Sequence, residues 1–114
     1  MSILASDIIN RAKAIWTEAA APNILSDPNT LLFLSDGVLG LRSIRPETAF
    51  VAGVHAEHVD VTITSQSIPV DVRFRPCLVD YLTGRGFQAD ANLENHEARA
   101  NRHMADFETK AKGA

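Results

Sequence analysis

Apolar residues recur at spacings of three and four in several stretches of the chain, which is the period of an amphipathic helix. The first stretch follows Ser6 and Asp7, where a hydroxyl can cap a helix and a carboxylate favours its positive end. Its apolar stripe consists of Ile8, Ala12, Ile15, Trp16 and Ala19. The following APNILSDPNT contains two prolines and two asparagines and predicts a loop. We therefore expect an opening helix with Ser6 as its N-cap.

A second helix is predicted in the densest apolar run of the chain, LLFLSDGVLGLRSIRPE at residues 31–47. Asp27 can cap its start, and Pro28 fits the first turn, where its missing N–H is not needed. Pro46 should end the helix, because the residue before a proline is disfavoured in the α region. The apolar stripe consists of Leu31, Leu34, Val38 and Leu41, flanked by Leu32, Leu39 and Ile44.

Two glycines, Gly37 and Gly40, lie in the middle of this apolar helix. Each costs about 0.8–1 kcal/mol of helix stability relative to alanine. Either they let another backbone come close, or they are merely tolerated at these positions. The sequence leaves both explanations open.

The period changes between residues 49 and 69. HVDVTIT, residues 58–64, alternates Val and Ile with Asp and Thr, which predicts a half-buried strand. The preceding AFVAGV, residues 49–54, is a weaker candidate for its partner strand. A lone two-stranded hairpin is marginal in water, so we expect it either to pack on the helices or to pair with a neighbouring subunit.

The helical period returns after Asp71, in a third helix that should begin near Pro76 or have a distorted first turn. Gly84 and Gly86 fall in what should be its last turns. The apolar positions of this helix are Val72, Cys77, Leu78, Tyr81 and Leu82.

A final helix closes the chain, and residues 110–114 are expected to fray. Its apolar stripe consists of Leu93, Ala100, Met104 and Phe107. The predicted fold class is therefore mainly α. We expect a small bundle of about four helices, with a short β-hairpin or strand segment between the second and third helices.

Length and composition limit the class of protein. The 114 residues predict a single domain over residues 1–114. A net charge of −3 disfavours a free-standing nucleic-acid-binding protein, which usually has a basic surplus. The single cysteine, Cys77, cannot form an internal disulfide, which favours a reducing compartment. The N-terminus lacks the features of a signal peptide, and no apolar run approaches the ~18 residues of a membrane span. We expect a small intracellular protein with no membrane contact.

Candidate catalytic and metal-binding chemistry is sparse. His55 and His58 lie three apart, and His96 and His103 lie seven apart, but a zinc site needs three or four ligands. Cys77 follows a proline at the start of a predicted helix and is expected to be a buried structural thiol. No nucleophile elbow and no glycine-rich phosphate loop is present. We expect no enzymatic activity, metal or cofactor.

Five arginines lie at or near predicted helix ends. Arg42 and Arg45 close the second helix, where a cation offsets the negative end of the helix dipole. Arg73 and Arg75 precede the third helix, and Arg85 lies between glycines. Their guanidinium groups could equally bind carboxylates or phosphates of a partner. The two roles are compatible, and both stay open.

Three stretches of the chain carry a resemblance that covers it almost end to end. They are ASDIINRAKAI at residues 5–15, LLFLSDGVLGLRSIRPE at residues 31–47, and RPCLVDYLTGRGF followed by QAD at residues 75–90. They resemble the first three helices of the head–tail connector, or adaptor (head completion), proteins of tailed bacteriophages. In that family the second helix ends in RP and an acid, and the third contains LVDYVL after a proline. This chain departs from the family in a shorter β segment and in Gly84 and Gly86.

The resemblance implies a structural protein of the virion neck, assembled in the cytoplasm of a bacterial host. Such subunits form a ring, typically of twelve, that docks under the portal protein and contacts the next neck or tail protein. Genomic DNA passes through the channel without sequence-specific binding. The family often engages the portal with its C-terminal segment, which places residues 100–114 at that interface here. The tail, about residues 108–114, is expected to be flexible or portal-engaging.

The same resemblance, with the open role of the arginines, gives a set of candidate residues for the interface with other subunits or with the portal. These residues are Arg42, Arg45, Arg73, Arg75, Arg85, Arg102, Met104, Phe107, Lys110 and Lys112.

Two other functions remain as alternatives. One is a tail-terminator or tail-completion protein, which belongs to the same structural class but acts at the other end of the neck. The other is a small helical DNA-binding regulator that reads DNA with the helix ending in Arg42 and Arg45. The acidic net charge argues against the regulator, because phosphate contacts dominate the affinity of such proteins.

Overall fold

Four α-helices contain most of the residues described by the computed structural model, which are residues 3–18, 27–51, 53–89 and 94–113. The helices are α1 (Ala5–Glu18), α2 (Asp27–Ile44), α3 (Arg75–Ala89) and α4 (Glu94–Gly113). Four two-residue strands form two small sheets, and three of these strands lie between α2 and α3 in the sequence. The predicted fold class, mainly α with a short β segment between the second and third helices, is confirmed.

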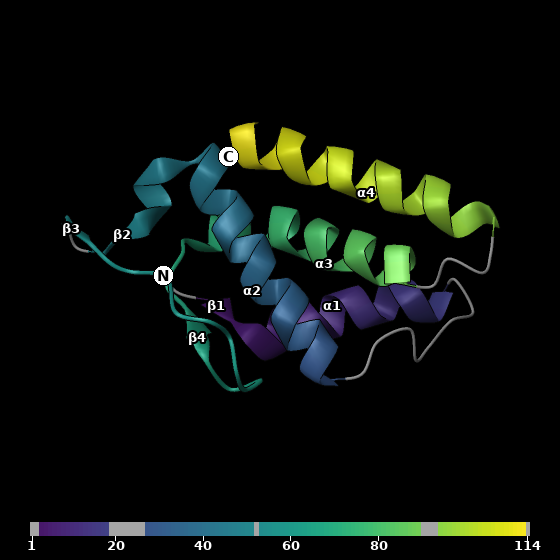
Figure 1. The fold of residues 1–114 in the computed structure, drawn as a ribbon, viewed down its shortest axis with the longest axis horizontal. Helices are drawn as coiled ribbons and strands as arrows, with labels where there is room; N and C mark the ends of the chain where they lie inside the picture. The colour runs from purple at the N-terminus through teal and green to yellow at the C-terminus, as the bar shows by residue number, and fades with distance from the viewer. Residues whose placement is uncertain (1–2, 19–26, 52, 90–93, 114) are drawn as a thin grey trace.

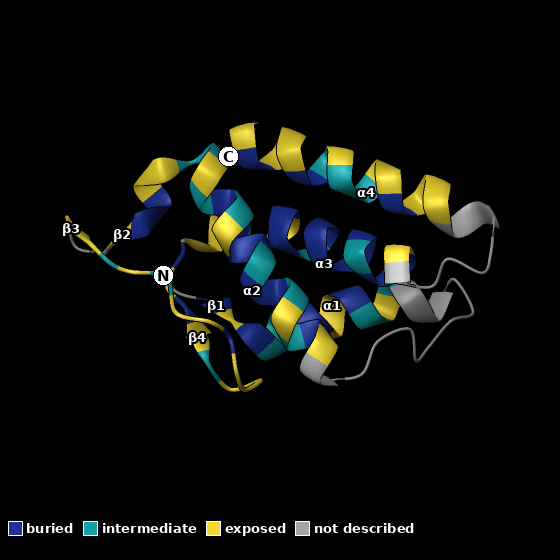
Figure 2. Cartoon of the chain, viewed as in Figure 1, coloured by how far each residue is buried: buried dark blue, intermediate teal, exposed yellow. Residues whose placement is uncertain are grey.

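The helix α3 lies at the centre of the fold and packs against each of the other three helices (Figure 1). Leu78 and Leu82 on this helix are fully buried, and Phe87 is almost so. Figure 2 shows that most of α3 is buried, whereas α4 has an exposed outer face. The core is therefore built around α3, although its apolar pattern was less regular than that of α2.

Most residues of the predicted apolar stripes face the core where the structure describes them, but Val72 lies before α3 and is exposed. On α2, Leu34, Val38 and Leu41 are buried, and on α4 Ala100 and Phe107 are buried. The stripe of α1 is confirmed by two buried residues, Ile8 and Ala12. The side chain of Trp16, and the residues Ala19 and Leu93, lie outside the described part of the chain.

The start of α1 is held by the chain between α2 and α3. The strand β1 (Ile3–Leu4) pairs antiparallel with β4 (Ser67–Ile68). Just beyond this pairing, the N–H groups of Ala5 and Ser6 donate to the carbonyl oxygens of Gln66 and Thr64, both at 2.9 Å.

The predicted N-cap at Ser6 is therefore wrong, because α1 begins at Ala5 and places Ser6 inside its first turn. The carbonyl oxygens of Gln66 and Thr64, far along the chain, accept from the first N–H groups of the helix. Without them, a local side chain would have to cap these groups.

The glycines of α2 and α3 lie where two helices approach closely. A Cβ atom at Gly37 would lie 2.7 Å from Cδ1 of Tyr81 on α3. A Cβ atom at Gly84 would lie 3.0 Å from Sδ of Met104 and 3.2 Å from the carbonyl oxygen of Ala100, both on α4. At Gly37 the close neighbour is therefore the ring of Tyr81 rather than another backbone, whereas at Gly84 a backbone oxygen of α4 comes close, and both approaches occur within one subunit.

The predicted strand at residues 58–64 is wrong. The strands of the hairpin are β2 (Phe50–Val51) and β3 (Val54–His55), which pair within the stretch that was expected to supply only a partner strand. Gly53 has a φ of 80° in the turn between them, a conformation that glycine adopts without a steric penalty.

Side chains hold residues 58–64 in place of a strand ladder. The N–H of Val61 donates to Oγ of the buried Ser35 on α2, at 2.7 Å. The side chain of Gln66 accepts from the N–H of Thr62 and donates to the carbonyl oxygen of Asp60, both at 3.0 Å. These side-chain bonds compete with sheet formation, so Val61 is buried while the neighbouring valine and isoleucine are exposed.

The third helix begins as predicted, at Arg75 with Pro76 in the first turn. A 3₁₀ turn, Val72–Phe74, precedes it, and the side chain of Asp71 caps this turn by accepting from the N–H of Arg73. The helix then runs through both of its glycines to Ala89.

The expectation of a frayed C-terminus is wrong for residues 110–113, and residues 108–113 are not a flexible tail. The helix α4 continues to Gly113, and Ala111 is fully buried. Arg45 donates from Nη1 to the carbonyl oxygen of Ala111 at 3.0 Å and to that of Lys112 at 3.4 Å. The end of α4 lies beside the end of α2 (Figure 1), so a side chain from α2's end caps the last turn of α4.

Candidate interaction surfaces and polar clusters

Most of the candidate interface residues have partners within the chain. Arg75 binds Asp7 of α1 at 3.1 Å. The hydrogen bond from Arg11 and then that from Arg75 lower the pKa of the Asp7 carboxyl group. Arg73 lies over the ring of Phe74 at 4.8 Å. These contacts give both arginines a role in holding the start of α3.

Arg85 joins α3 to α2. Its guanidinium lies 4.2 Å from the ring centroid of Phe33 and 3.6 Å from a carboxylate oxygen of Asp36. Its Nη1 also donates to the hydroxyl of Tyr81 at 2.7 Å. An arginine between two glycines therefore sits against two aromatic rings and a carboxylate, without leaving the subunit.

Arg45 joins three elements near the end of α2. Besides capping α4, it forms an ion pair with Glu47, which lowers the pKa of that carboxyl group. Its guanidinium lies 5.4 Å from the ring centroid of Phe74. Helix-end stabilisation is thus one role of Arg45, although the helix it caps is α4.

Apart from Arg42 on α2, the remaining candidates lie on α4. Phe107 is buried and meets Tyr81 edge to face, with ring centroids 5.0 Å apart. Met104 is half-buried beside Gly84, whereas Arg102 and Lys112 are exposed. The role of these residues in an interface with other subunits or with the portal stays a prediction. Only the exposed ones could reach a partner without rearranging the core.

A polar cluster joins α3 to α4 at Asp80, which the sequence did not single out. His103 Nδ1 lies 2.9 Å from one carboxylate oxygen of Asp80, and Lys110 Nζ lies 2.6 Å from the other. Burial opposes ionisation of Asp80, but these two partners outweigh it and lower its pKa. The ring of His103 also stacks on Phe87, at 5.9 Å between centroids.

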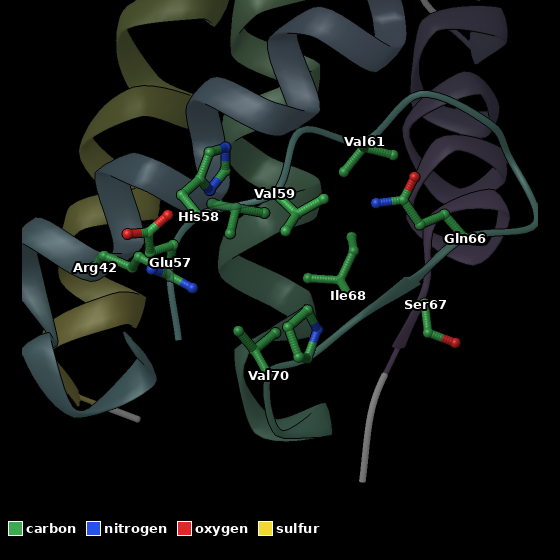
Figure 3. A pocket seen from close by; sticks show the side chains of 11 residues that line it. Arg42, Glu57, His58, Val59, Val61, Gln66, Ser67, Ile68 and Val70 are labelled. Carbon is green, nitrogen blue, oxygen red and sulfur yellow. The ribbon is translucent and has the colours of Figure 1, made fainter. Parts of the chain in front are cut away.

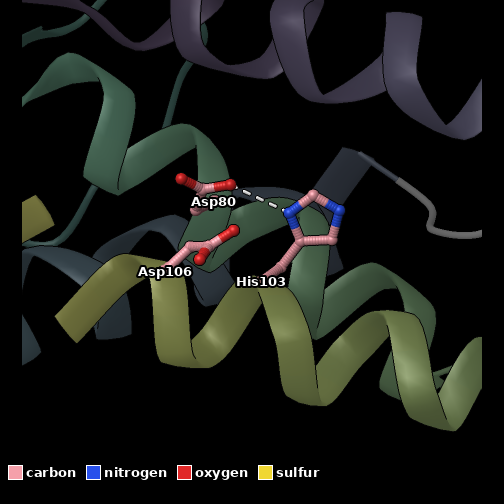
Figure 4. A group of neighbouring side chains, drawn as sticks. All are labelled: Asp80, His103 and Asp106. Atoms are coloured by element: carbon pink, nitrogen blue, oxygen red, sulfur yellow. Dashed lines mark hydrogen bonds and ion pairs between the residues drawn. The ribbon is translucent and has the colours of Figure 1, made fainter. Parts of the chain in front are cut away.

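Asp106 completes a group that has the donor types of a metal site. Single ligand atoms of Asp80, His103 and Asp106 lie within 4.8 Å of one another (Figure 4). Two carboxylates and an imidazole are ligands that Zn²⁺ accepts. However, Lys110 already places a cation against Asp80, and a metal ion there would meet its repulsion. We therefore interpret this cluster as an ion-pair connection between α3 and α4.

Cys77 is buried, as expected for a structural thiol. Burial raises its pKa to about 11, and Sγ donates to the carbonyl oxygen of Phe74 at 2.9 Å. A thiol with such a pKa holds almost no thiolate at neutral pH, so it is a poor nucleophile.

A pocket of about 280 Å³ lies between α2 and the segment of residues 57–70. Figure 3 shows Val59, Val61 and Ile68 gathered around it, with Arg42 and His58 to one side. Arg42 donates from Nη1 to the carbonyl oxygen of Ala56 at 2.7 Å, which holds its guanidinium beside the pocket.

Most of the large apolar side chains exposed on the described surface lie on two parts of it, with Leu4 and Val72 exposed elsewhere. One part is the β2–β3 hairpin and the segment after it, where Phe50, Val54, Val59 and Ile63 are each at least half exposed. The other is the outer face of α2, where Leu32 and Leu39 lie two helical turns apart. Figure 2 shows the exposed hairpin at one extreme of the molecule, well away from the buried centre.

No protein-family model, curated protein or solved structure matches this chain. Among the helices that the structure describes, none is both long enough and apolar enough to cross a membrane. Functional arguments therefore rest on the residues and their geometry.

Proposed function

We propose that this chain is an adaptor subunit of the head–tail connector of a tailed bacteriophage. In this role it forms a ring under the portal protein, and the ring extends the DNA channel toward the next neck or tail protein. The proposal rests on the resemblance of three helical stretches and on one structural observation. That observation is the presence of large exposed apolar side chains on two different surfaces, the hairpin segment and the outer face of α2.

Two separate apolar surfaces suit a ring better than a symmetric pair. In a ring each subunit presents one surface to the subunit before it and a different surface to the subunit after it. Val54 on the hairpin and Leu39 on α2 are examples of such exposed side chains, and neither is needed in the core. Exposed apolar patches of this kind are characteristic of surfaces that bind other proteins.

The charges of the chain are compatible with a DNA channel that must not hold the DNA. Many of its arginines are paired with carboxylates or lie on aromatic rings within the subunit, as Arg75 and Arg85 do. With a net charge of −3, the subunit offers little of the basic surplus that binds phosphates tightly.

The decisive experiment is to mix the purified chain with its cognate portal protein and to determine the mass of the complexes by native mass spectrometry. We expect a ring of this chain bound to the portal, with the same number of subunits as the portal or a simple ratio to it. A chain that stays separate from the portal at micromolar concentrations would overturn the proposal. Salt-sensitive retention on duplex DNA would then favour the regulator, and binding to a tail tube would favour a tail-completion protein.

A further inference from the structure

Two buried nitrogen atoms beside the pocket have no hydrogen-bond partner. They are Nε of Arg42 and Nδ1 of His58, and both residues line the pocket between α2 and residues 57–70. Buried polar atoms in folded proteins are nearly always hydrogen-bonded, so each exception needs an explanation. Two exceptions at one pocket indicate that a ligand supplies the missing partner.

The other nitrogens of these side chains are held in place. Nη1 of Arg42 donates to the carbonyl oxygen of Ala56 at 2.7 Å, and Nε2 of His58 lies 2.9 Å from a carboxylate oxygen of Asp60. Nε of Arg42 is then a donor without a partner, while Nδ1 of His58 donates or accepts according to the tautomer of its ring. A carboxylate accepts hydrogen bonds from the guanidinium, and bonds between charged partners are the strong ones.

Most of the remaining wall of the pocket is apolar, and its other polar lining residues are Glu57, Gln66 and Ser67. Its apolar lining residues are Val38, Val59, Val61, Ile68, Pro69 and Val70. A volume of about 280 Å³ lies just below the range of pockets that enclose whole drug-sized molecules. It suits one aliphatic side chain with a neighbouring carboxylate.

The surroundings of the pocket favour a protein segment as its occupant. Val59 lines the pocket and is 71% exposed, and Ile63 in the same segment is 57% exposed. A small-molecule site is normally enclosed, whereas this apolar lining continues onto the surface, as docking sites for proteins do.

We propose that this pocket binds an acidic–aliphatic segment of a partner protein. The carboxylate of a Glu or Asp in that segment accepts from Arg42 Nε, beside His58, and an adjacent aliphatic side chain packs on the valines. The inference concerns the chemistry of the pocket and does not depend on the adaptor function, which the portal experiment tests separately.

Binding requires a small opening of the pocket, because both nitrogens are closed to solvent in this conformation. Residues 56–62 form no helix or strand, so the opening is resisted by individual bonds, such as that from the N–H of Val61 to Oγ of Ser35, rather than by a strand ladder. Glu57 also lines the pocket and is exposed, so its own carboxylate competes with that of a ligand for the guanidinium of Arg42.

Methyl NMR titration of the full chain tests the proposal with two peptides, acetyl-Leu-Glu-Leu-amide and acetyl-Leu-Gln-Leu-amide. The Glu peptide should cause saturable shifts in the methyl signals of Val38, Val61 and Val70. The Gln peptide, which has the same shape and no charge, should bind at least about ten-fold more weakly, because the charged hydrogen bonds are lost.

Variants assign the effect to the pocket. Arg42→Gln should weaken the Glu peptide about ten-fold and leave the Gln peptide unchanged. Arg42→Gln also loses the bond to Ala56, so Glu57→Gln provides a second test that leaves that bond intact. Glu57→Gln should strengthen binding of the Glu peptide, because a competing carboxylate is removed. Arg102→Gln, an exposed arginine of α4 that does not line the pocket, is the matched control and should have no effect.

The proposal would be overturned if the parent protein bound the two peptides equally well. It would also be overturned if the Arg42→Gln variant bound the Glu peptide as tightly as the parent does. The absence of shifts at the pocket valines would overturn it too. Binding of isovalerate alone, without binding of the Glu peptide, would show a metabolite pocket and would also overturn it.

Discussion

Gly37 and Gly40 illustrate how two identical residues in one helix can have opposite effects. A Cβ atom at Gly37 would lie 2.7 Å from the buried ring of Tyr81, a separation that real Cβ atoms essentially never show. At Gly40 the nearest atom is Cζ of Phe107 at 3.5 Å, an ordinary van der Waals contact. Only the first glycine is therefore required by the packing of α2 against α3.

The two alanine variants should differ in sign. Gly37→Ala should lower the free energy of unfolding by about 1–3 kcal/mol, because the Tyr81 ring must shift within a packed core. Gly40→Ala should raise it by up to about 1 kcal/mol, because alanine is the better helix former and no atom has to move. Urea denaturation measures both, and a stabilised Gly37→Ala variant would contradict the close approach.

Asp80 is the residue whose ionisation matters most for the helix pair α3 and α4. The pKa of Asp80 is lowered in the folded state from the ordinary value of 3.8. At pH values between the lowered pKa and 3.8, the folded protein therefore binds fewer protons than the unfolded chain. The stabilisation from Asp80 is therefore complete above that value and is lost as the pH falls through the lowered pKa.

Asp80→Asn should reduce the free energy of unfolding at pH 7 by about 1.5–3 kcal/mol, the usual contribution of hydrogen bonds to a charged group. The difference between the variant and the parent should shrink as the pH falls below 3.8, where the unfolded chain takes up the proton first, and should vanish below the lowered pKa, where the folded carboxyl is protonated too. Denaturation between pH 7 and pH 2.5 measures this convergence.

Asp106→Asn on the same helix pair is the control, and we expect it to change stability by less than about 0.5 kcal/mol. A constant difference between Asp80→Asn and the parent at every pH would contradict the ionisation argument.

At the scale of elements, the end of α2 determines how α4 ends. Lysines at positions 110 and 112 suit the negative end of the helix dipole, but the carbonyl oxygens of Ala111 and Lys112 are capped by Arg45. This contact joins segments 66 residues apart, so no local signal marks it. It converts a terminus that was expected to fray into a packed turn.

Arg45→Gln should loosen the last turn of α4 with little effect elsewhere. Hydrogen exchange at the amides of residues 111–113 should become several-fold faster, while the amides of α3 should exchange as before. Mass spectrometry of the exchanging protein measures both regions in one experiment. Arg102→Gln, with its exposed side chain, should leave both regions unchanged. Unaltered exchange at residues 111–113 in Arg45→Gln would show that Ala111 burial alone holds the turn.

At the scale of the whole molecule, the described surface combines a well-packed helical centre with apolar side chains at one extreme. Val54 is 69% exposed on a hairpin that contributes little to the core. Its replacement should therefore affect association with other proteins more than folding, which separates the two properties experimentally.

Val54→Asp should leave the free energy of unfolding within about 0.5 kcal/mol of the parent, because the side chain is exposed. The same variant should weaken ring formation on the portal at least ten-fold, since a charge would be buried in the apolar contact. Analytical ultracentrifugation with the portal measures the second effect. Glu108→Gln, on the exposed face of α4, provides a comparison at a site away from the hairpin. Normal rings with Val54→Asp would exclude the hairpin from the interface.

The sequence by itself determined the helices, because their signals are local. Apolar residues at spacings of three and four, with prolines at the boundaries, were enough to predict α2 and the start of α3. The period-two pattern at residues 58–64 was misleading, because Ser35 and Gln66 bind that backbone from other positions. The pairing of β1 with β4 escaped notice because each strand has only two residues.

Only the tertiary structure decided what the polar residues do. His103 lies 23 residues after Asp80 in the sequence, and Lys110 lies 30 residues after it. Only the packing of α3 on α4 brings the three side chains together. The pocket at Arg42 and His58 likewise requires α2 to meet a segment with no regular structure. Helix formation depends on neighbours in the sequence, whereas a site depends on which faces pack together. For that reason the sequence determined the elements, and the fold determined the candidate sites.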